Sequence, residues 1–163
     1  MNESRKTIWH RDIGMAVLAL AVVIVASLLG QSATFPNLAP WYAGLAKPWF
    51  NPPNWVFGPV WTALYVLMAF AGWRILRLLP VRRTALVLFF GQLALNIAWS
   101  WMFFAARSPL LGLINIVPQW VLIVATITVF ARLDRLAAWC LAPLAAWVGY
   151  AAILNMAIWW LNG

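Results

Sequence analysis

The chain has 163 residues, of which 66% are hydrophobic and 9% are charged. Soluble domains are about 45–50% apolar and about 25% charged, so this composition excludes an ordinary water-soluble protein. The net charge of +8 at pH 7 would suit nucleic-acid binding, but the lysines and arginines flank apolar segments instead of gathering on one polar face. That arrangement is typical of membrane topology signals, and we expect no nucleic-acid partner.

Long stretches without a charged residue follow one another along the chain. They comprise residues 13–46, 48–73, 84–106, 108–131 and 136–163. A helix rises about 1.5 Å per residue, so about 20 apolar residues cross the roughly 30 Å of hydrocarbon in a bilayer. We therefore predict an all-α fold, an integral membrane bundle that forms a single domain over residues 1–163. The predicted transmembrane helices are five, at about 13–33, 54–79, 82–106, 109–131 and 136–161.

Several residues indicate where these helices begin and bend. Asn54 is a suitable N-cap for the second helix, and Pro109 fits the first turn of the fourth. Pro118 and Pro143 fall inside the fourth and fifth helices and predict kinks. The first segment could instead belong to a signal peptide, but its apolar core, residues 13–29, is longer than is usual for one. Because the last three connections are short, we expect successive helices to be antiparallel neighbours.

The connection between the first two helices, residues 35–53, is long and unusual in composition. Six of the ten prolines lie between Pro36 and Pro59, and Lys47 is the only charged residue in the connection. Disorder requires polarity and charge, which this segment lacks, and long loops without a helical pattern are often functional. We expect an ordered loop that packs as a lid over the outer end of the bundle.

Residues that carry most enzyme chemistry are scarce. The chain has one cysteine, Cys140, and one histidine, His10, and no carboxylate falls inside an apolar segment. We therefore expect no disulfide, no bound metal and no other cofactor, and no nucleophile–base or carboxylate pair for catalysis. An ion-coupled transporter would be expected to carry charged residues or histidines inside its membrane segments, which argues against that class. A structural role in an assembly remains an alternative.

Polar and aromatic residues recur at helical spacing within the apolar segments. The third helix carries Gln92, Asn96 and Ser100 beside Trp99; the fourth carries Asn115 and Gln119; the fifth carries Trp147, Ala151, Leu154 and Asn155; and the second carries Trp61, Tyr65 and Met68. Such residues should face protein rather than lipid. A mostly apolar surface with a few amides is typical of a small-molecule site, although the amides could equally serve only to bond helices together. Trp61, Trp99, Trp120 and Trp147 lie too deep for an interfacial belt, so they should pack against neighbours or a planar ligand.

The run from Trp41 to Tyr65, WYAGLAKPWFNPPNWVFGPVWTALY, resembles the signature of the TspO/MBR family of tryptophan-rich sensory and translocator proteins. The pattern Gln92-Leu-x-Leu-Asn96-x-x-Trp99-Ser100 in the third helix continues the resemblance, as does Trp147-x-x-x-Ala151-x-x-Leu154-Asn155 in the fifth. It implies a five-helix membrane protein, commonly a homodimer, in which a cavity under the first loop binds porphyrins, other tetrapyrroles and similar aromatic ligands. The implied function is that of a membrane receptor, sensor or carrier.

The resemblance also implies which residues contact the ligand. By position they are Tyr42, Pro52, Phe57, Trp61, Tyr65, Asn96, Trp99, Trp147, Ala151 and Leu154. An alternative function in the family is light- and oxygen-dependent porphyrin degradation, for which Trp61 and Trp147 would be the catalytic candidates. Animal members bind sterol through a basic residue after a tyrosine in the fifth helix. No basic residue follows Tyr150 in this chain, so sterol is not expected as a ligand.

The distribution of lysine and arginine predicts the orientation in the membrane. The N-terminal tail and the connections after the second and fourth helices hold nine of these residues, whereas the opposite side holds only Lys47 and Arg107. By the positive-inside rule we predict a cytoplasmic N-terminus and an external C-terminus, in a bacterial cell membrane. Labelling of single cysteines at the two ends of the chain in intact cells checks this. Two ends on the same side would contradict both the orientation and the odd number of crossings.

Overall fold

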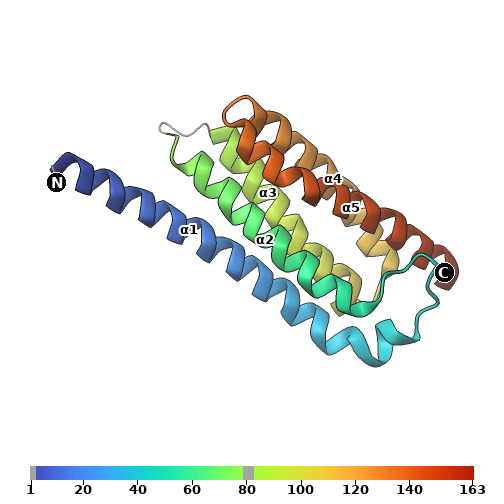
Figure 1. The fold of residues 1–163 in the computed structure, drawn as a ribbon. Helices are drawn as coiled ribbons and strands as arrows, with labels where there is room; N and C mark the ends of the chain where they lie inside the picture. The colour runs from blue at the N-terminus through green and yellow to red at the C-terminus, as the bar shows by residue number, and fades with distance from the viewer. Residues whose placement is uncertain (1–2, 79–82) are drawn as a thin grey trace.

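The computed structural model describes residues 3–78 and 83–163, and its described part is helical without a strand (Figure 1). The long helices are α1 (Glu3–Thr34), α2 (Asn54–Leu76), α3 (Arg83–Ser100), α4 (Pro109–Ala131) and α5 (Arg135–Asn162). Short turns follow α1 (η1, Phe35–Asn37, and η2, Leu38–Tyr42) and α3 (η3, Trp101–Ala105). Five helices are long and apolar enough to span a membrane. The predicted all-α membrane bundle is confirmed.

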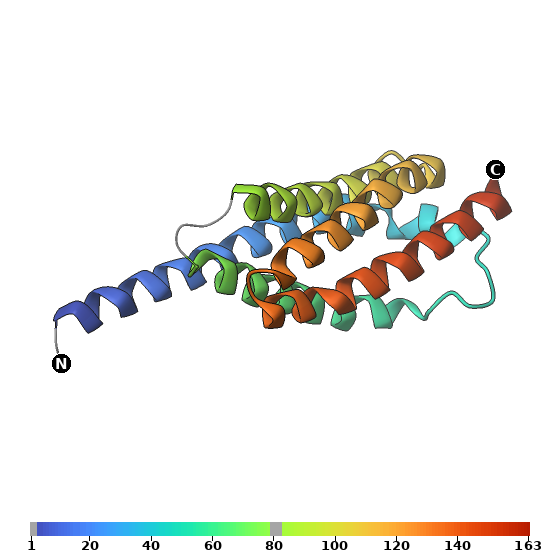
Figure 2. The ribbon, with the colours of Figure 1, turned by 90° about the horizontal axis from the view of Figure 1, so that it is seen from above.

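The helices form a closed ring. The closely packed pairs are α1 with α2, α2 with α5, α5 with α4, α4 with α3, and α3 with α1 (Figures 1 and 2). The expected neighbour relation is therefore confirmed for α3–α4 and α4–α5, but it is wrong for α2 and α3, whose described backbones are not closely packed. The reason is that α1 packs against both of them. Side chains of α2 and α3 instead meet across the interior of the ring.

The ends of several helices differ from the prediction. α1 begins at Glu3 rather than near residue 13 and projects beyond the other helices (Figure 1), because hydropathy marks the membrane-spanning part of a helix and not its polar extension. α2 ends at Leu76 rather than near residue 79; the predicted start of the third helix at residue 82 lies outside the described residues. Asn54 is the first residue of α2 and not its N-cap, which is Pro53, whose backbone is still extended.

The connection between α1 and α2 is more helical than expected. Turns of 3-10 and π type follow α1 as far as Tyr42, and apart from a break at Ala39 the chain is irregular only over residues 45–53. Pro36 fits the first turn of a 3-10 helix, where its missing N–H is not needed. The helix breaks at Ala39, whose backbone is extended, one residue before Pro40, as proline disfavours helical geometry in the residue that precedes it.

Ion pairs hold helices together at the end where α2 ends and α5 begins. The Arg74 guanidinium on α2 lies 2.7 Å from the carboxylate of Asp134, which also caps α5 by accepting from the Ala137 N–H at 3.0 Å. Arg77 lies 3.1 Å from the carboxylate of Asp12 on α1. Each pair joins two helices, and each lies among the basic residues that predict the cytoplasmic side.

Asp134→Asn tests the first of these pairs. The amide oxygen keeps the helix cap, but the charge that pairs with Arg74 is lost, so thermal unfolding in detergent should show a loss of about 1 kcal/mol. Asp12→Asn is the control. Its partner Arg77 has a side chain 40% exposed, against 30% for Arg74, so the control should cost less. An equal or larger loss for Asp12→Asn would contradict this ranking.

The contribution of Asp134 should depend on pH in a defined direction. Burial raises the pKa of Asp134, but hydrogen bonds from Ala137 and Arg74, together with the arginine charge, outweigh it and hold the pKa below its usual 3.8. A depressed folded-state pKa means that the stabilisation is complete above the unfolded-state pKa and disappears as the pH falls through the folded value. The difference between wild type and Asp134→Asn should therefore stay constant from pH 7 to about pH 5 and shrink below about pH 4.

Candidate functional site

Aromatic side chains close the end of the ring that lies beside the α1–α2 loop. Tyr42, Phe103, Phe104, Leu154 and Ile158 form a buried cluster. The π turn η3 places the consecutive residues Phe103 and Phe104 both inward, where they are 2% and 8% exposed. A regular helix turns by about 100° per residue and would separate them more, whereas a π turn widens the helix locally. The π turn thus directs two consecutive aromatic rings into the interior, where a regular helix would direct only one.

A second group of aromatic residues lies beneath this cluster. The rings of Trp61 and Tyr65, one turn apart on α2, have centroids 5.5 Å apart, and the Tyr65 hydroxyl donates to Asn96 Oδ1 on α3 at 3.0 Å. On α5, the Trp147 ring lies edge-on to Phe57 of α2, with centroids 5.8 Å apart. Side chains from α2, α3 and α5 therefore converge in the interior of the ring, although α5 is not next to α2 or α3 in sequence.

The amide side chains that the helical spacing predicts on the inner faces are buried, as expected. Their exposed fractions are 0% for Gln92, 5% for Asn96, 6% for Asn115, 2% for Gln119 and 2% for Asn155. Asn155 joins three helices, because its Oδ1 accepts from Trp99 Nε1 on α3 at 3.1 Å and its Nδ2 donates to the Pro109 carbonyl on α4 at 2.7 Å. Asn155 therefore bonds helices together, and Asn96 accepts from Tyr65 across the interior and orients its ring.

Ser100 does not share the inner face with the amides of α3. It packs against α1, where its Oγ lies 3.3 Å from the position that a side chain at Gly30 would occupy. Eight residues of helix turn through about 800°, so Ser100 lies about 80° away from Gln92 around the axis.

Trp120 is also outside the interior: it is 41% exposed and its Nε1 donates to the Ala145 carbonyl at 2.9 Å.

The loop between α1 and α2 is bonded to α5 at two points. The Tyr150 hydroxyl donates to the Phe50 carbonyl at 2.7 Å. Asn162 pairs with Ala46 in both directions, since its Oδ1 accepts from the Ala46 N–H and its Nδ2 donates to the Ala46 carbonyl, each at 2.9 Å. Because both bonds come from one helix, the loop is fixed to the C-terminal half of α5, beside which it runs (Figure 1). We call Tyr150–Phe50 and Asn162–Ala46 the two latches.

Lys47 stiffens the same loop from within. Its ammonium donates to the carbonyls of Tyr42 at 2.6 Å and Leu45 at 3.1 Å, and it lies 4.6 Å from the centre of the Tyr42 ring. A lysine so used caps the free carbonyls at the end of the preceding helical turns. The Lys47 ammonium in this apolar loop is therefore bonded to backbone carbonyls of the loop and of the turn before it.

The structure places the predicted ligand residues in one region, and several of them contact one another there. The aromatic cluster at the loop end includes or contacts four of them, Tyr42, Phe57, Trp99 and Leu154. Five others pack below this cluster, namely Trp61, Tyr65, Asn96, Trp147 and Ala151. Pro52 lies in the loop, where its carbonyl accepts from the Asn51 side chain. Two described hollows lie elsewhere. Sequence reasoning missed the latch residues Tyr150 and Asn162, since a hydrogen bond to a loop backbone leaves no spacing signal.

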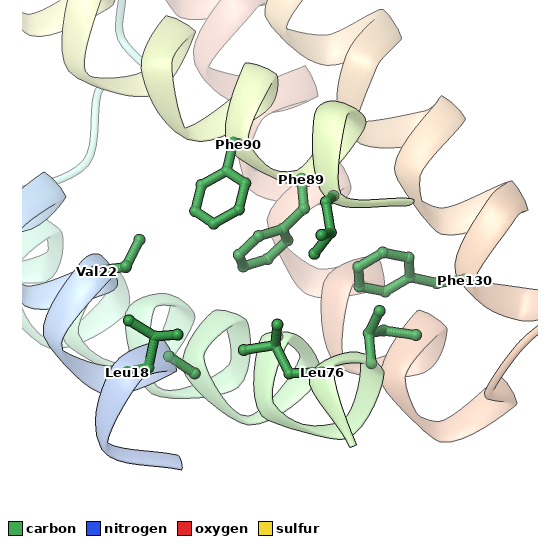
Figure 3. Close-up of a pocket in the computed structure, with 10 residues that line it drawn as sticks. Leu18, Val22, Leu76, Phe89, Phe90 and Phe130 are labelled. Atoms are coloured by element: carbon green, nitrogen blue, oxygen red, sulfur yellow. The ribbon is translucent and has the colours of Figure 1, made fainter. Parts of the chain in front are cut away.

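One of these hollows is apolar and lies near the opposite end of the bundle. It has a volume of about 20 Å³ and is lined by α1, α2, α3 and Phe130 of α4, with Phe89 and Phe90 on one side and Leu18 and Val22 on the other (Figure 3). The other has a volume of about 240 Å³ and lies outside the aromatic cluster, between Trp41, Arg107 and Trp159. Neither is lined by a predicted ligand residue.

A ring of five apolar helices, closed over an aromatic and amide interior by a latched loop, defines an integral membrane protein with one internal candidate site. The TspO/MBR family profile matches residues 17–161. The chain therefore belongs to the TspO/MBR family.

Relatives match along most of their own length. The tryptophan-rich protein TspO of Chlorobaculum tepidum is 38% identical over 161 residues, which cover 94% of this chain and 99% of that protein. The tryptophan-rich sensory protein of Cereibacter sphaeroides is 35% identical over 88% of this chain and 92% of its own. The translocator protein of Homo sapiens is 38% identical over 73% of each chain.

Tyr150→Phe tests the first latch. It removes only the hydroxyl that donates to Phe50, at a cost of about 1 kcal/mol, which should raise the open fraction of the loop about fivefold. Hydrogen exchange of the amides in residues 45–53 measures this fraction. Tyr65→Phe is the matched control, because it removes a tyrosine hydroxyl bonded to Asn96 and not to the loop. Equal exchange in the two variants would contradict a latch at Tyr150.

Proposed function

We propose that the chain is a membrane sensor or carrier that binds tetrapyrroles, such as porphyrins, and similar aromatic ligands between α2, α3 and α5 beneath the latched loop. The observation that carries the proposal is the convergence of Trp61, Tyr65, Asn96 and Trp147 from these three helices. Flat rings offer stacking surfaces for a macrocycle, and a single tyrosine–amide pair supplies orienting polar groups. The names of the relatives support the sensory or translocating role.

Binding in this region requires the aromatic side chains to separate. Phe57 and Trp147 now contact one another, as do Trp61 and Tyr65. A ligand that inserts between them exchanges ring–ring contacts for ring–macrocycle contacts of the same kind, so the cost of opening is offset by similar contacts. The loop has to be released at its latches to α5 for entry from the outer side, and its prolines limit the conformational entropy that reclosing removes.

The proposal includes the protein's setting. The nine-to-two distribution of basic residues supports a bacterial cell membrane with the N-terminus in the cytoplasm, which puts the latched loop and the entry on the outer side. The family resemblance supports a homodimer. No sterol is proposed as a ligand, because no basic residue follows Tyr150 on α5.

Asn96→Leu tests the polar part of the site. It removes the acceptor of the Tyr65 hydroxyl and should weaken porphyrin binding or destabilise the bundle by about 1 kcal/mol, since hydrogen bonds inside membrane proteins average about 0.6 kcal/mol. Quenching of tryptophan fluorescence by a porphyrin series, in detergent and in the dark, measures the affinity. Ser100→Ala is the control, because Ser100 faces α1. Unchanged affinity and stability in Asn96→Leu would remove Asn96 from the site.

A second candidate function is light- and oxygen-dependent porphyrin degradation. The observation that favours it is that two oxidisable indoles, Trp61 and Trp147, each lie against a tyrosine, Tyr65 and Tyr150, with ring centroids 5.5 and 5.7 Å apart. An indole beside a photoexcited macrocycle can give it an electron, and the neighbouring phenol ring is a further oxidisable group. Dioxygen would be the terminal oxidant.

The double variant Trp61→Phe with Trp147→Phe separates binding from this chemistry. Phenylalanine keeps a flat apolar ring, so porphyrin affinity should stay within about tenfold, while any photodegradation by the parent beyond a lit, protein-free control should be lost. Trp120→Phe with Trp139→Phe is the matched control, since these indoles are 41% and 73% exposed and lie outside the cluster. Degradation at the parent's rate in the first double variant would assign the activity to the porphyrin alone.

A further inference from the structure

Arg107 has a backbone conformation that arginine rarely adopts. Its φ of 52° lies in the left-handed region, and among the described residues it is the one non-glycine residue with a positive φ. The conformation ends η3: the Arg107 N–H donates to the Phe104 carbonyl at 3.2 Å, and the Ser108 N–H donates to the Phe103 carbonyl at 3.1 Å. Glycine is the usual residue at such a helix end, because it has no Cβ to clash. The arginine side chain at this strained position therefore requires an explanation.

The Arg107 guanidinium is held at one edge and open at the other. Its Nε donates to Asn37 Oδ1 at 3.2 Å, and Asn37 is itself fixed to α1, because its Nδ2 donates to the Ala33 carbonyl at 2.9 Å. The ion pairs of the described residues belong to Arg74 and Arg77, so no carboxylate among these residues neutralises Arg107. The bond at Nε orients the guanidinium and leaves its terminal N–H groups for an acceptor outside the chain.

Arg107 lines a hollow of about 240 Å³. Three segments form this hollow: the chain at Trp41, the connection over residues 107–110, and the end of α5 at Trp159 and Asn162. Figure 1 shows the end of α5 beside the α1–α2 loop, at one end of the bundle. The Trp41 ring is fixed by edge-on packing against Phe103, with centroids 5.5 Å apart. The hollow thus combines one cation with two indole rings.

The hollow lies at the depth of lipid headgroups. α4 has 23 residues, which span about 35 Å, slightly more than the roughly 30 Å of hydrocarbon in a bilayer. The hollow adjoins the first residue of this helix, Pro109. Tryptophans exposed at the same end, Trp49 at 94% and Trp160 at 80%, fit the membrane–water interface. Phosphates of lipids are the abundant anions at that depth.

We propose that this hollow binds the phosphate of a membrane phospholipid, with Arg107 as its charged anchor. A guanidinium fork matches two oxygens of a phosphate, and the rings of Trp41 and Trp159 give apolar walls to the adjoining glycerol. A free phosphate has the same oxygens but leaves these walls unused, which favours the lipid. Lys47 does not compete for the phosphate, because its ammonium donates to backbone carbonyls. The proposal does not depend on which ligand binds in the aromatic interior.

Solid-state NMR measures the contact directly. Protein with ¹³C in its guanidinium carbons is placed in phosphatidylglycerol bilayers, and the dephasing of each carbon by lipid ³¹P is recorded. The Arg107 signal is the one missing from Arg107→Gly, a variant that should fold because glycine suits a φ of 52°. Arg132, exposed at the opposite end of the bundle, gives the level of ordinary headgroup contact, and Arg132→Gln identifies its signal. Arg107 should dephase faster than Arg132; equal or slower dephasing would overturn the proposal.

Two further comparisons locate the phosphate and its source. Trp159→Ala removes a wall of the hollow and should lower the dephasing of Arg107 to the level of Arg132. Trp160→Ala is the matched control, because Trp160 is the next residue but does not line the hollow; equal effects of the two variants would contradict the site. In bilayers of digalactosyldiacylglycerol, a lipid without phosphate, with inorganic phosphate in the buffer, the Arg107 carbon should not dephase. Dephasing there would assign the site to free phosphate and overturn the lipid proposal.

Discussion

Lipid hydrocarbon offers no hydrogen bonds, and this constraint organises the whole molecule. Any polar side chain within the spans has to find its partner inside the protein. The amides of α3, α4 and α5 accordingly turn inward, where Asn155 alone bonds to groups on two other helices. In the closed ring, α2, α3 and α5 share one interior, although α5 is not a neighbour of the other two in sequence. The same inward turn gathers the aromatic residues that form the candidate site.

The fifth helix connects the interior to the loop above it. Trp147 contributes a ring to the site, Tyr150 bonds the loop at Phe50, and Asn155 anchors α3 and α4. These residues lie within nine consecutive positions, which are about two and a half turns of the helix. The proposed ligand would separate Trp147 from Phe57 and would therefore act on the helix that also holds the loop closed. The arrangement would give such a ligand a physical route to the loop.

The two ends of the bundle are built by different means. The end that carries most of the basic residues uses charge: Arg74 and Arg77 of α2 pair with carboxylates at the start of α5 and on α1. The end that carries the α1–α2 loop holds it through hydrogen bonds to backbone carbonyls and through a lysine that caps the preceding turns. These uncharged latches can open without separating ions, whereas opening the other end would separate charge pairs.

Much of this was decided by the sequence alone. The spacing of charged residues determined five spans, because the width of the hydrocarbon sets a minimum apolar length. The helical spacing correctly predicted that Gln92, Asn96, Asn115 and Asn155 are buried, because polar side chains avoid lipid whatever their neighbours are. The signature from Trp41 to Tyr65 was enough to indicate the family, since it combines several residues at fixed spacing.

Only the tertiary structure decided which helices touch and which atoms pair. Short connections suggested that α2 and α3 are neighbours, but the packing of α1 against both separates them. The spacing of four residues predicted that Ser100 lies on the same face as Gln92 and Asn96. Over eight residues the side-chain direction rotates by about 80°, and Ser100 instead faces α1. The latches from Tyr150 and Asn162 join residues about a hundred positions apart. Local pattern carries no information on such pairs, because their geometry depends on how whole helices settle against one another.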